Sequence, residues 1–259
     1  MSDLNHILYT VISFVLTAIG LLILAKKVDK NEHKCIVLKV SAILTVILHF
    51  SSLYVDYFSG IENPGVEQPM LLPLYPCNVA MWLLVIVAFH KNKSGKLFDF
   101  LAMATFYLGV FGGVIGIVFN QNYIATPDMA DWGILKGLLS HSTMLFGCIY
   151  LLIGGYVKIA VSNMLYVFLG LLLLVSDGAI IIFLHWIFGL ELPNSMYLLE
   201  IPFESMPWLN VVTIGILAMV LIFTATALYE QFAFKKEDRW YTKIKTFIEG
   251  KKSNKKSEV

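Results

Sequence analysis

The stretch VISFVLTAIGLLILAKK, residues 11–27, decides the fold, because a nearly unbroken apolar run ends there at two lysines. A helix needs about 20 mostly apolar residues to cross the roughly 30 Å hydrocarbon core of a bilayer. The whole chain of 259 residues is 58% hydrophobic and 14% charged, with a mean hydropathy of +0.76. These values lie outside the usual composition of soluble domains, so we expect the chain to fold in a bilayer.

Seven apolar stretches of this kind follow one another, separated by short polar loops. The predicted spans lie near residues 5–25, 36–58, 72–90, 98–120, 134–154, 163–189 and 209–230. They predict an all-α, polytopic membrane protein, a bundle of seven transmembrane helices within a single domain, residues 1–234. Residues 235–259 are a basic tail.

Lysine and arginine orient this bundle, because positive charge in short loops marks the cytoplasmic side. Of the 19 Lys and Arg residues, 17 fall in the first, third and fifth loops or in the tail. The alternate loops are acidic and contain Glu62, Glu67, Asp128, Asp131, Glu191, Glu200 and Glu204. The pattern predicts that the N-terminus lies outside and the C-terminus in the cytoplasm.

Other compositional features bear on location and partners. The start Met1-Ser2-Asp3 has no basic leader or cleavage site, so we expect no removable signal peptide. Eighteen lysines against one arginine suggest an AT-rich genome, and we expect a multi-pass protein of a bacterial plasma membrane with phospholipids as partners. No signature of nucleic-acid binding occurs and no cofactor is implied, while the oligomeric state is unknown from sequence.

The tail carries Trp240, Ile244, Phe247 and Ile248 at helical spacing among lysines. Such a pattern predicts an interfacial amphipathic helix on anionic lipid. A solvated basic tail that serves only topology explains the charges equally well.

Ionisable side chains inside a bilayer indicate function, because burying them unpaired costs about 2.5 to 3.5 kcal/mol. Four spans place such a residue about 6 to 14 Å below the predicted outer surface. These residues are His49, Cys77, His141 and His185, and Asp177 lies deeper in the sixth span. This layer is the predicted site.

The segment before the third span reads Leu71-Leu72-Pro73-Leu74-Tyr75-Pro76-Cys77-Asn78. Its two prolines predict that the regular helix starts at Pro76, which would leave only about 22 Å of helix up to His90. Cys77 then occupies the second helical position, where free N–H groups and the helix dipole favour a thiolate. Together with a base such as His141 it would suit covalent catalysis.

Each of these residues also has a purely structural reading. Cys77 can be a small buried packing residue, and His141 can be a hydrogen-bond tie between helices. Gly109, Gly112, Gly113 and Gly116 form small-xxx-small pairs in the fourth span. We expect them to pack within the bundle rather than in a homodimer.

The sequence from Leu72 to Asn78 resembles that of the YwaF family of bacterial membrane proteins, whose animal relative is transmembrane protein 164. The family pattern is a Leu-Pro-Leu-His-Leu-Cys segment, a downstream histidine and an Asn-Tyr-Met-Tyr-Leu-like stretch. The counterparts here are Cys77, His141 and Asn194-Ser195-Met196-Tyr197-Leu198. The chain departs from the family pattern at two positions, where Tyr75 replaces the motif histidine and Ser195 replaces a tyrosine.

The animal relative is regarded as an acyltransferase that moves fatty acyl chains between phospholipids through a cysteine thioester. The resemblance implies that Cys77 is the nucleophile and His141 the base of a phospholipid acyltransferase or thioesterase. Supporting or substrate-binding roles would fall to Asn78, His49, Asp177, His185, Asn194 and Tyr197.

Three other functions are compatible with the sequence. A small solute or proton-coupled transporter would use Asp177 and the histidines as relay groups, although the halves show no repeat. A zinc-dependent lipid hydrolase would need His49, His141, His185 and Asp177 together, but no His-x-x-x-His pair anchors an ion, so we expect no metal. A non-enzymatic membrane scaffold would need none of these side chains.

Overall fold

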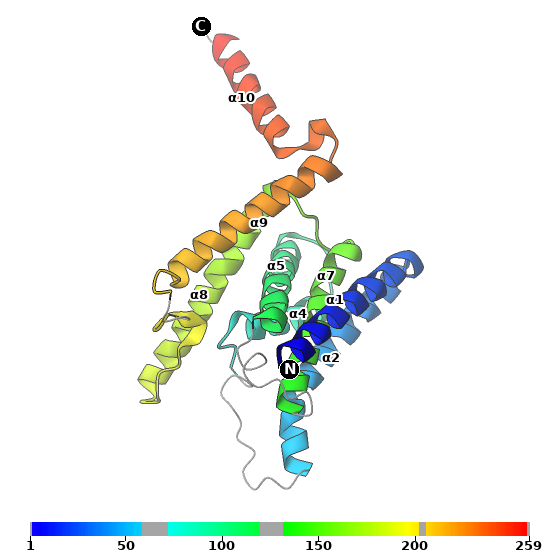
Figure 1. Ribbon diagram of the computed structural model, residues 1–259. Coiled ribbons are helices and arrows are strands. Elements are labelled where there is room, and N and C mark those ends of the chain that lie inside the picture. Colours follow the sequence, from blue (N-terminus) through cyan, green and yellow to red (C-terminus); the bar gives the residue numbers. More distant parts are fainter. Residues whose placement is uncertain (1, 59–71, 120–131, 202–205, 258–259) are drawn as a thin grey trace.

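The computed structural model describes residues 2–58, 72–119, 132–201 and 206–257 (Figure 1). Its helices are α1 (Ser2–Lys27), α2 (Asn31–Phe58), α4 (Pro76–Phe89), α5 (Lys96–Val118), α7 (Trp132–Ile153), α8 (Met164–Ile187), α9 (Val211–Ala233) and α10 (Trp240–Ser257). Short 3-10 turns are η1 (Val161–Asn163), η2 (Ser195–Tyr197) and η3 (Lys236–Asp238). No strand occurs in these ranges, so the all-α prediction is confirmed.

Six helices in the described ranges are long and apolar enough to cross a membrane, namely α1, α2, α5, α7, α8 and α9. The third predicted span, 72–90, contains a helix that is shorter than expected of a membrane span. Its helix α4 has 14 residues, about 21 Å of rise. Pro76 stands at the first helical position, and Tyr75 before it is extended, with φ −124° and ψ 156°. The prolines thus set the helix start, as the sequence predicted.

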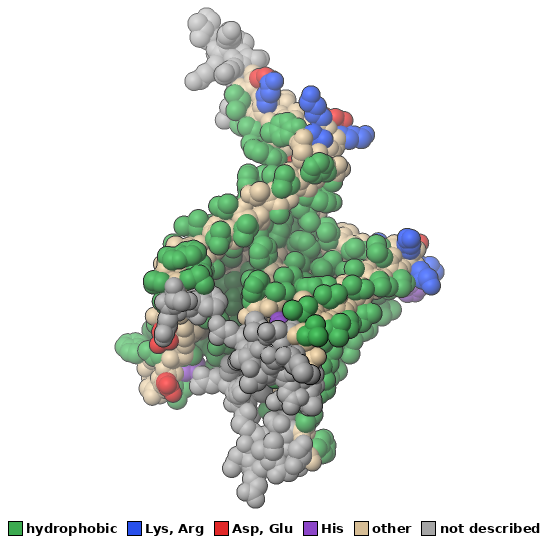
Figure 2. Space-filling view, viewed as in Figure 1, with side chains coloured by type: hydrophobic (Ala, Val, Ile, Leu, Met, Phe, Trp, Pro, Cys, Tyr) green, Lys and Arg blue, Asp and Glu red, His purple; other side chains and the backbone are tan. Residues whose placement is uncertain are grey.

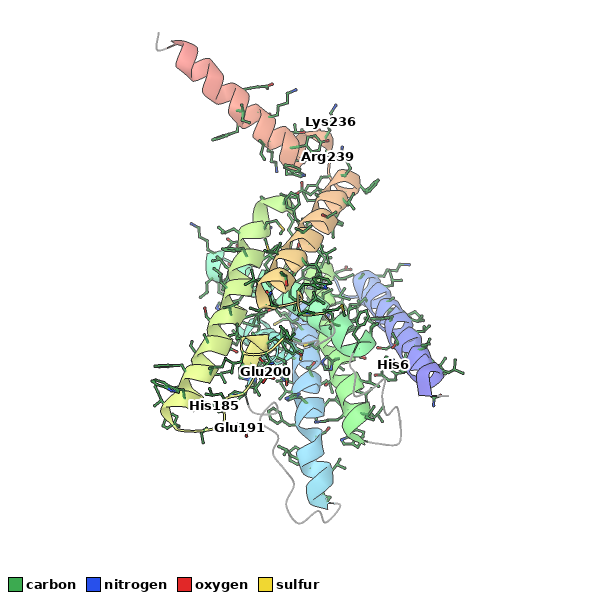
Figure 3. All side chains as sticks on the ribbon, turned by 60° about the vertical axis from the view of Figure 1, so that its left-hand side comes forward. His6, His185, Glu191, Glu200, Lys236 and Arg239 are labelled. Carbon is green, nitrogen blue, oxygen red and sulfur yellow. The ribbon has the colours of Figure 1, made fainter. Side chains whose placement is uncertain are left out.

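One end of the bundle collects the lysine-rich segments. Cation–π contacts and one aromatic pair join the first part of α2 to the end of α4, and also connect the segments that follow α4, α7 and α9. They are Lys39 with Phe89 (5.5 Å), Lys93 with Phe98 (5.6 Å), Phe98 with Tyr156 (6.3 Å) and Lys158 with Phe234 (5.0 Å). Lys236 and Arg239 lie toward this end in Figure 3, while Glu191 and Glu200 lie toward the other.

Helix α5 lies at the centre of the bundle, between α4, α7 and α8, while α2 packs on α4 and α7 (Figure 1). Small residues bring the central helices close together. Gly147 of α7 faces Leu84 of α4 and Ser41 of α2, and Gly170 of α8 faces Ala104 of α5. The tight contacts make the central helices a rigid frame for the side chains at their interfaces.

Large apolar side chains cover the outer faces of α1, α8 and α9 (Figure 2). Leu16, Phe183 and Ile216 are examples, and each is about half exposed or more. In water such a surface would be very costly, but in hydrocarbon it is the expected one. The chain is therefore a multi-pass membrane protein.

Candidate functional site

Cys77 and His141 meet the same face of α5. A Cβ built on Gly112 would lie 3.4 Å from the Cα and 3.6 Å from the Cβ of Cys77. A Cβ built on Gly116 would overlap the His141 ring, whose Cγ would be 3.0 Å away. Gly112 and Gly116 are one helical turn apart, so their Cβ positions are separated by about 6 Å. Cys77 of α4 and His141 of α7 therefore contact the same face of α5, one helical turn apart.

The other two glycines of the stripe contact α7. A Cβ on Gly113 would lie 2.9 Å from the Cβ of Leu145, and one on Gly109 would collide with Cys148. All four glycines of the stripe thus serve close approach of helices inside one chain. The prediction that they pack within the bundle is confirmed.

The hydrogen bond of His141 sets its tautomer. Its Nδ1 lies 2.8 Å from the backbone oxygen of Gly137. A carbonyl oxygen only accepts hydrogen bonds, so in the neutral ring Nδ1 carries the proton and Nε2 presents a lone pair. Nε2 is also among the ring atoms nearest to Gly116. His141 is thus oriented with its basic nitrogen toward α5, as a proton acceptor requires.

Asn78 holds the start of α4. Its Oδ1 accepts a hydrogen bond from the backbone N–H of Tyr75 at 3.2 Å, and its own N–H donates to the Tyr75 oxygen at 2.9 Å. The buried Asn78 side chain therefore closes the helix cap. This cap fixes half-buried Cys77 at the second helical position, with its backbone against Gly112.

The turn η2 docks on the residues just before α4. The N–H of Met196 donates to the oxygen of Leu74 at 2.9 Å, and the Ser195 hydroxyl donates to the same oxygen at 3.4 Å. The rings of Tyr75 and Tyr197 lie 5.8 Å apart. Both departures from the family pattern, Tyr75 and Ser195, thus belong to two segments in mutual contact.

The backbone of this turn is strained. Met196 and Tyr197 have φ of 53° and 56°, in the left-handed region that costs a residue with a Cβ about 1 to 2 kcal/mol. Asn194 braces the turn, because its Oδ1 accepts from the N–H groups of Leu199 and Glu200. Strain maintained by its surroundings is typical of functional sites.

Helix α8 provides the seat for the turn. A Cβ on Gly178 would lie 2.8 Å from Cγ of Met196 and 2.9 Å from Cδ1 of Leu198, so only glycine allows this approach. The seat holds the Tyr197 ring beside that of Tyr75, which precedes Cys77 by two residues. Burial, with Tyr75 and Cys77 nearby, raises the pKa of Tyr197, which keeps the phenol protonated.

The other predicted site residues occupy different surroundings. Asp177 precedes Gly178, and its buried Oδ2 has no hydrogen-bond partner in the described part of the chain. His185 lies about 10 Å further along α8 from Gly178 and its Nδ1 donates to the Ile181 oxygen at 2.9 Å (Figure 3). The backbone oxygen of His49 accepts from Lys136 of α7 at 3.4 Å. Among described residues, no three His, Cys, Asp or Glu side chains are grouped to hold a metal ion.

Sequence reasoning missed a polar stripe on α1. His6 is buried and its Nε2 donates to the Ile117 oxygen, 2.7 Å away and next to Gly116. Ser13 shares a hydrogen bond of 2.7 Å with Ser142, the neighbour of His141. The spacing of His6, Thr10, Ser13 and Thr17 along one helix face was the available signal. These contacts help to hold α1 against the His141 region.

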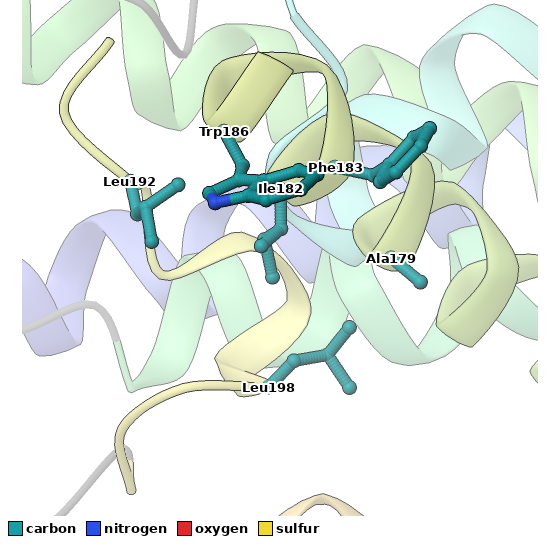
Figure 4. Close-up of a pocket in the computed structure, with 6 residues that line it drawn as sticks. All are labelled: Ala179, Ile182, Phe183, Trp186, Leu192 and Leu198. Atoms are coloured by element: carbon teal, nitrogen blue, oxygen red, sulfur yellow. The ribbon is translucent and has the colours of Figure 1, made fainter. Parts of the chain in front are cut away.

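An open apolar pocket of about 380 Å³ lies between α8 and the segment that contains the turn (Figure 4). It is lined by Ala179, Ile182, Phe183, Trp186, Leu192 and Leu198. Leu198 follows Tyr197, so this pocket begins beside the turn that contacts Leu74 and Tyr75. Neither Cys77 nor His141 lines it.

Fold and site together define a polytopic helical membrane protein with a cysteine and a histidine at a central helix. The TMEM164 family model matches residues 1–229, and the chain belongs to this family. The searches of curated proteins and of solved structures found no match to the chain.

Proposed function

We propose that the protein is a phospholipid acyltransferase that works through a thioester on Cys77. The observation that carries this proposal is the pair of glycines on α5, which brings the thiol-bearing helix and the His141 ring to one face. The tautomer of His141 supports it, because its unprotonated nitrogen faces the same helix.

The reaction starts when His141 Nε2 takes the proton of the Cys77 thiol and the sulfur attacks the carbonyl carbon of a phospholipid ester. The tetrahedral intermediate expels the lysophospholipid oxygen, which receives the proton back from His141. An acyl thioester remains on Cys77. A second lysophospholipid hydroxyl then gives its proton to His141 and attacks the thioester, which releases the thiol and a new phospholipid. Attack by water instead gives a free fatty acid, the thioesterase outcome.

Tyr197 donates the hydrogen bond that stabilises the intermediate's oxyanion in this scheme. Its raised pKa keeps the phenol protonated, and its strained, braced turn holds it near Cys77. A donor placed in advance is worth about 10² to 10³ in rate at comparable sites. Asn78 and Asn194 then act as positioning residues, for α4 and for the turn respectively.

The membrane topology proposed from sequence accompanies this function: seven crossings, with the N-terminus outside and the C-terminus in the cytoplasm of a bacterial plasma membrane. The contact of Lys39 with Phe89 supports α4 as a crossing, because it places the end of α4 at the lysine-rich end. The opposite end of α4 contacts η2, on the acidic side of the bundle. The apolar cavity at Leu198 would hold one acyl chain.

Intact-protein mass spectrometry tests the proposal. The chain is purified in mild detergent from membranes and compared before and after hydroxylamine treatment. We expect a hydroxylamine-sensitive mass of one acyl chain that is absent from Cys77→Ser. Cys148→Ser is the matched control, because Cys148 packs against Gly109 and has no role in the scheme. Full lipid exchange by both Cys77→Ser and His141→Ala would refute the proposal.

A second candidate function rests on Asp177. Its buried Oδ2 has no hydrogen-bond partner among the described residues, which is costly in a membrane and suits a proton relay in a small transporter. Uptake into proteoliposomes that depends on Asp177 and persists in Cys77→Ser would favour this function over acyl transfer.

A further inference from the structure

The residues at the start of helix α10 pack against the lysine-rich end of the bundle. The rings of Trp240 and Phe223 of α9 form an edge contact at 5.9 Å. The Arg239 Nε donates to the backbone oxygen of Phe234 at 3.1 Å. The start of α10 is therefore a structured junction and not the beginning of a loose tail.

Glu230 of α9 is the centre of this junction. Only 2% of it is exposed, and its two oxygens accept hydrogen bonds from two different segments. Oε1 accepts from the N–H of Val161 at 2.6 Å, and Oε2 accepts from the N–H of Trp240 at 2.9 Å. One buried carboxylate thus caps the beginnings of η1 and α10 together, a placement that the helix dipole favours. It ties α10 to the point where α8 starts.

Beyond the junction, α10 presents an unusual surface. Tyr241, Ile244, Phe247 and Ile248 are 39%, 50%, 62% and 47% exposed. At 100° per residue they share one arc of the helix, which we call the apolar arc. Lys243 and Lys245 lie on either side of this arc, and both are exposed. Figure 2 shows hydrophobic and basic side chains together on this part of the molecule.

From these features we propose that the apolar arc of α10 binds the surface of an anionic phospholipid leaflet. The bilayer surface is within reach, because α9, which is long and apolar enough to cross a membrane, ends at Ala233, only seven residues before Trp240. The arc would enter the boundary between headgroups and acyl chains, while the flanking lysines contact lipid phosphates. The proposal is independent of the acyl-transfer chemistry at Cys77.

Charge decides between lipid and a second copy of the helix as occupant. Two α10 helices that met through their apolar arcs would bring Lys243 and Lys245 of one copy toward the same lysines of the other, which is unfavourable although Lys245 also lies 4.0 Å from Glu249 of its own helix. An anionic leaflet turns the same lysines into attractive contacts, each worth about a fivefold gain in partitioning.

A fluorescent label on α10 reports whether this helix binds the lipid surface when the full chain is held in lipid nanodiscs. An environment-sensitive nitrobenzoxadiazole group is attached at Ile248→Cys, within the arc, or at Thr246→Cys, on the opposite face. Cys35, Cys77 and Cys148 are replaced by serine, and unchanged size-exclusion profiles establish folding. Nanodiscs contain phosphatidylcholine alone or with phosphatidylglycerol.

We expect a several-fold rise and a blue shift of emission at position 248 in phosphatidylglycerol nanodiscs only, with no change at position 246. Lys243→Gln with Lys245→Gln should weaken this response about tenfold or more, as should high salt. Equal emission at 248 in both lipids would overturn the proposal. So would equal responses at 246 and 248, or quenching of the label by a second labelled copy in either lipid.

Discussion

Replacement of Gly116 by alanine is the sharpest test of the Cys77–His141 arrangement. The new methyl group would overlap the His141 ring, whose Nδ1 is held by the Gly137 oxygen. The ring cannot keep this hydrogen bond and clear the methyl group unless α5 and α7 separate. We expect either movement to take Nε2 away from Cys77.

The size of both effects follows from the geometry. Overpacking in a rigid core lowers the free energy of unfolding by about 1 to 3 kcal/mol. The higher helix propensity of alanine relative to glycine offsets up to about 1 kcal/mol of this loss. The net loss of up to about 2 kcal/mol would lower the Tm in detergent by up to a few degrees. A displacement of about 1 Å at a reacting group can reduce turnover about 100-fold.

A double-mutant cycle separates this clash from other effects. His141→Ala removes the ring, so Gly116→Ala should cost little stability in that background, and the coupling energy should reach about 1 kcal/mol or more. Gly215→Ala on α9 is the control, because a Cβ there meets nothing within 4 Å. Tm values of the four cycle members and thioester yield of the single variants are the measurements. An equal cost of Gly116→Ala with and without the His141 ring would show that the two residues are not in contact.

Three further predictions follow from other contacts. Tyr197→Phe should lower kcat about 10² to 10³-fold with little change in KM, and an unchanged kcat would remove Tyr197 from the mechanism. Because the pKa of Tyr197 is raised, difference absorbance of the wild type should show its phenol ionising above the ordinary tyrosine pKa of about 10. Gly178→Ala should push Met196 and Leu198 off α8 and reduce thioester yield more than Gly215→Ala does, and equal yields would contradict the seat described for the turn. Glu230→Gln leaves one buried N–H without an acceptor and should cost about 1 to 3 kcal/mol by thermal unfolding. The exposed Glu237→Gln is its control, and identical Tm values would argue against the double cap.

Several features were predictable from the sequence because they depend on neighbouring residues only. Transfer of apolar side chains into hydrocarbon is a local property, so hydropathy located the six long membrane helices. Proline restricts its own backbone and that of the preceding residue, so the start of α4 at Pro76 was also predictable. The glycine spacing on α5 likewise indicated close helix contact inside the bundle.

What the sequence by itself determined, then, is a helical membrane protein with a set of glycines for close packing. Only the tertiary structure decided which polar groups meet, because the rotation of each helix depends on how neighbouring surfaces interlock. Gly112 and Gly116 let Cys77 and His141 contact one face of α5, and Ser195 reaches Leu74 across 121 positions of the chain. The buried contacts of His6 and Glu230 arise in the same way, since each joins helices that no local pattern relates.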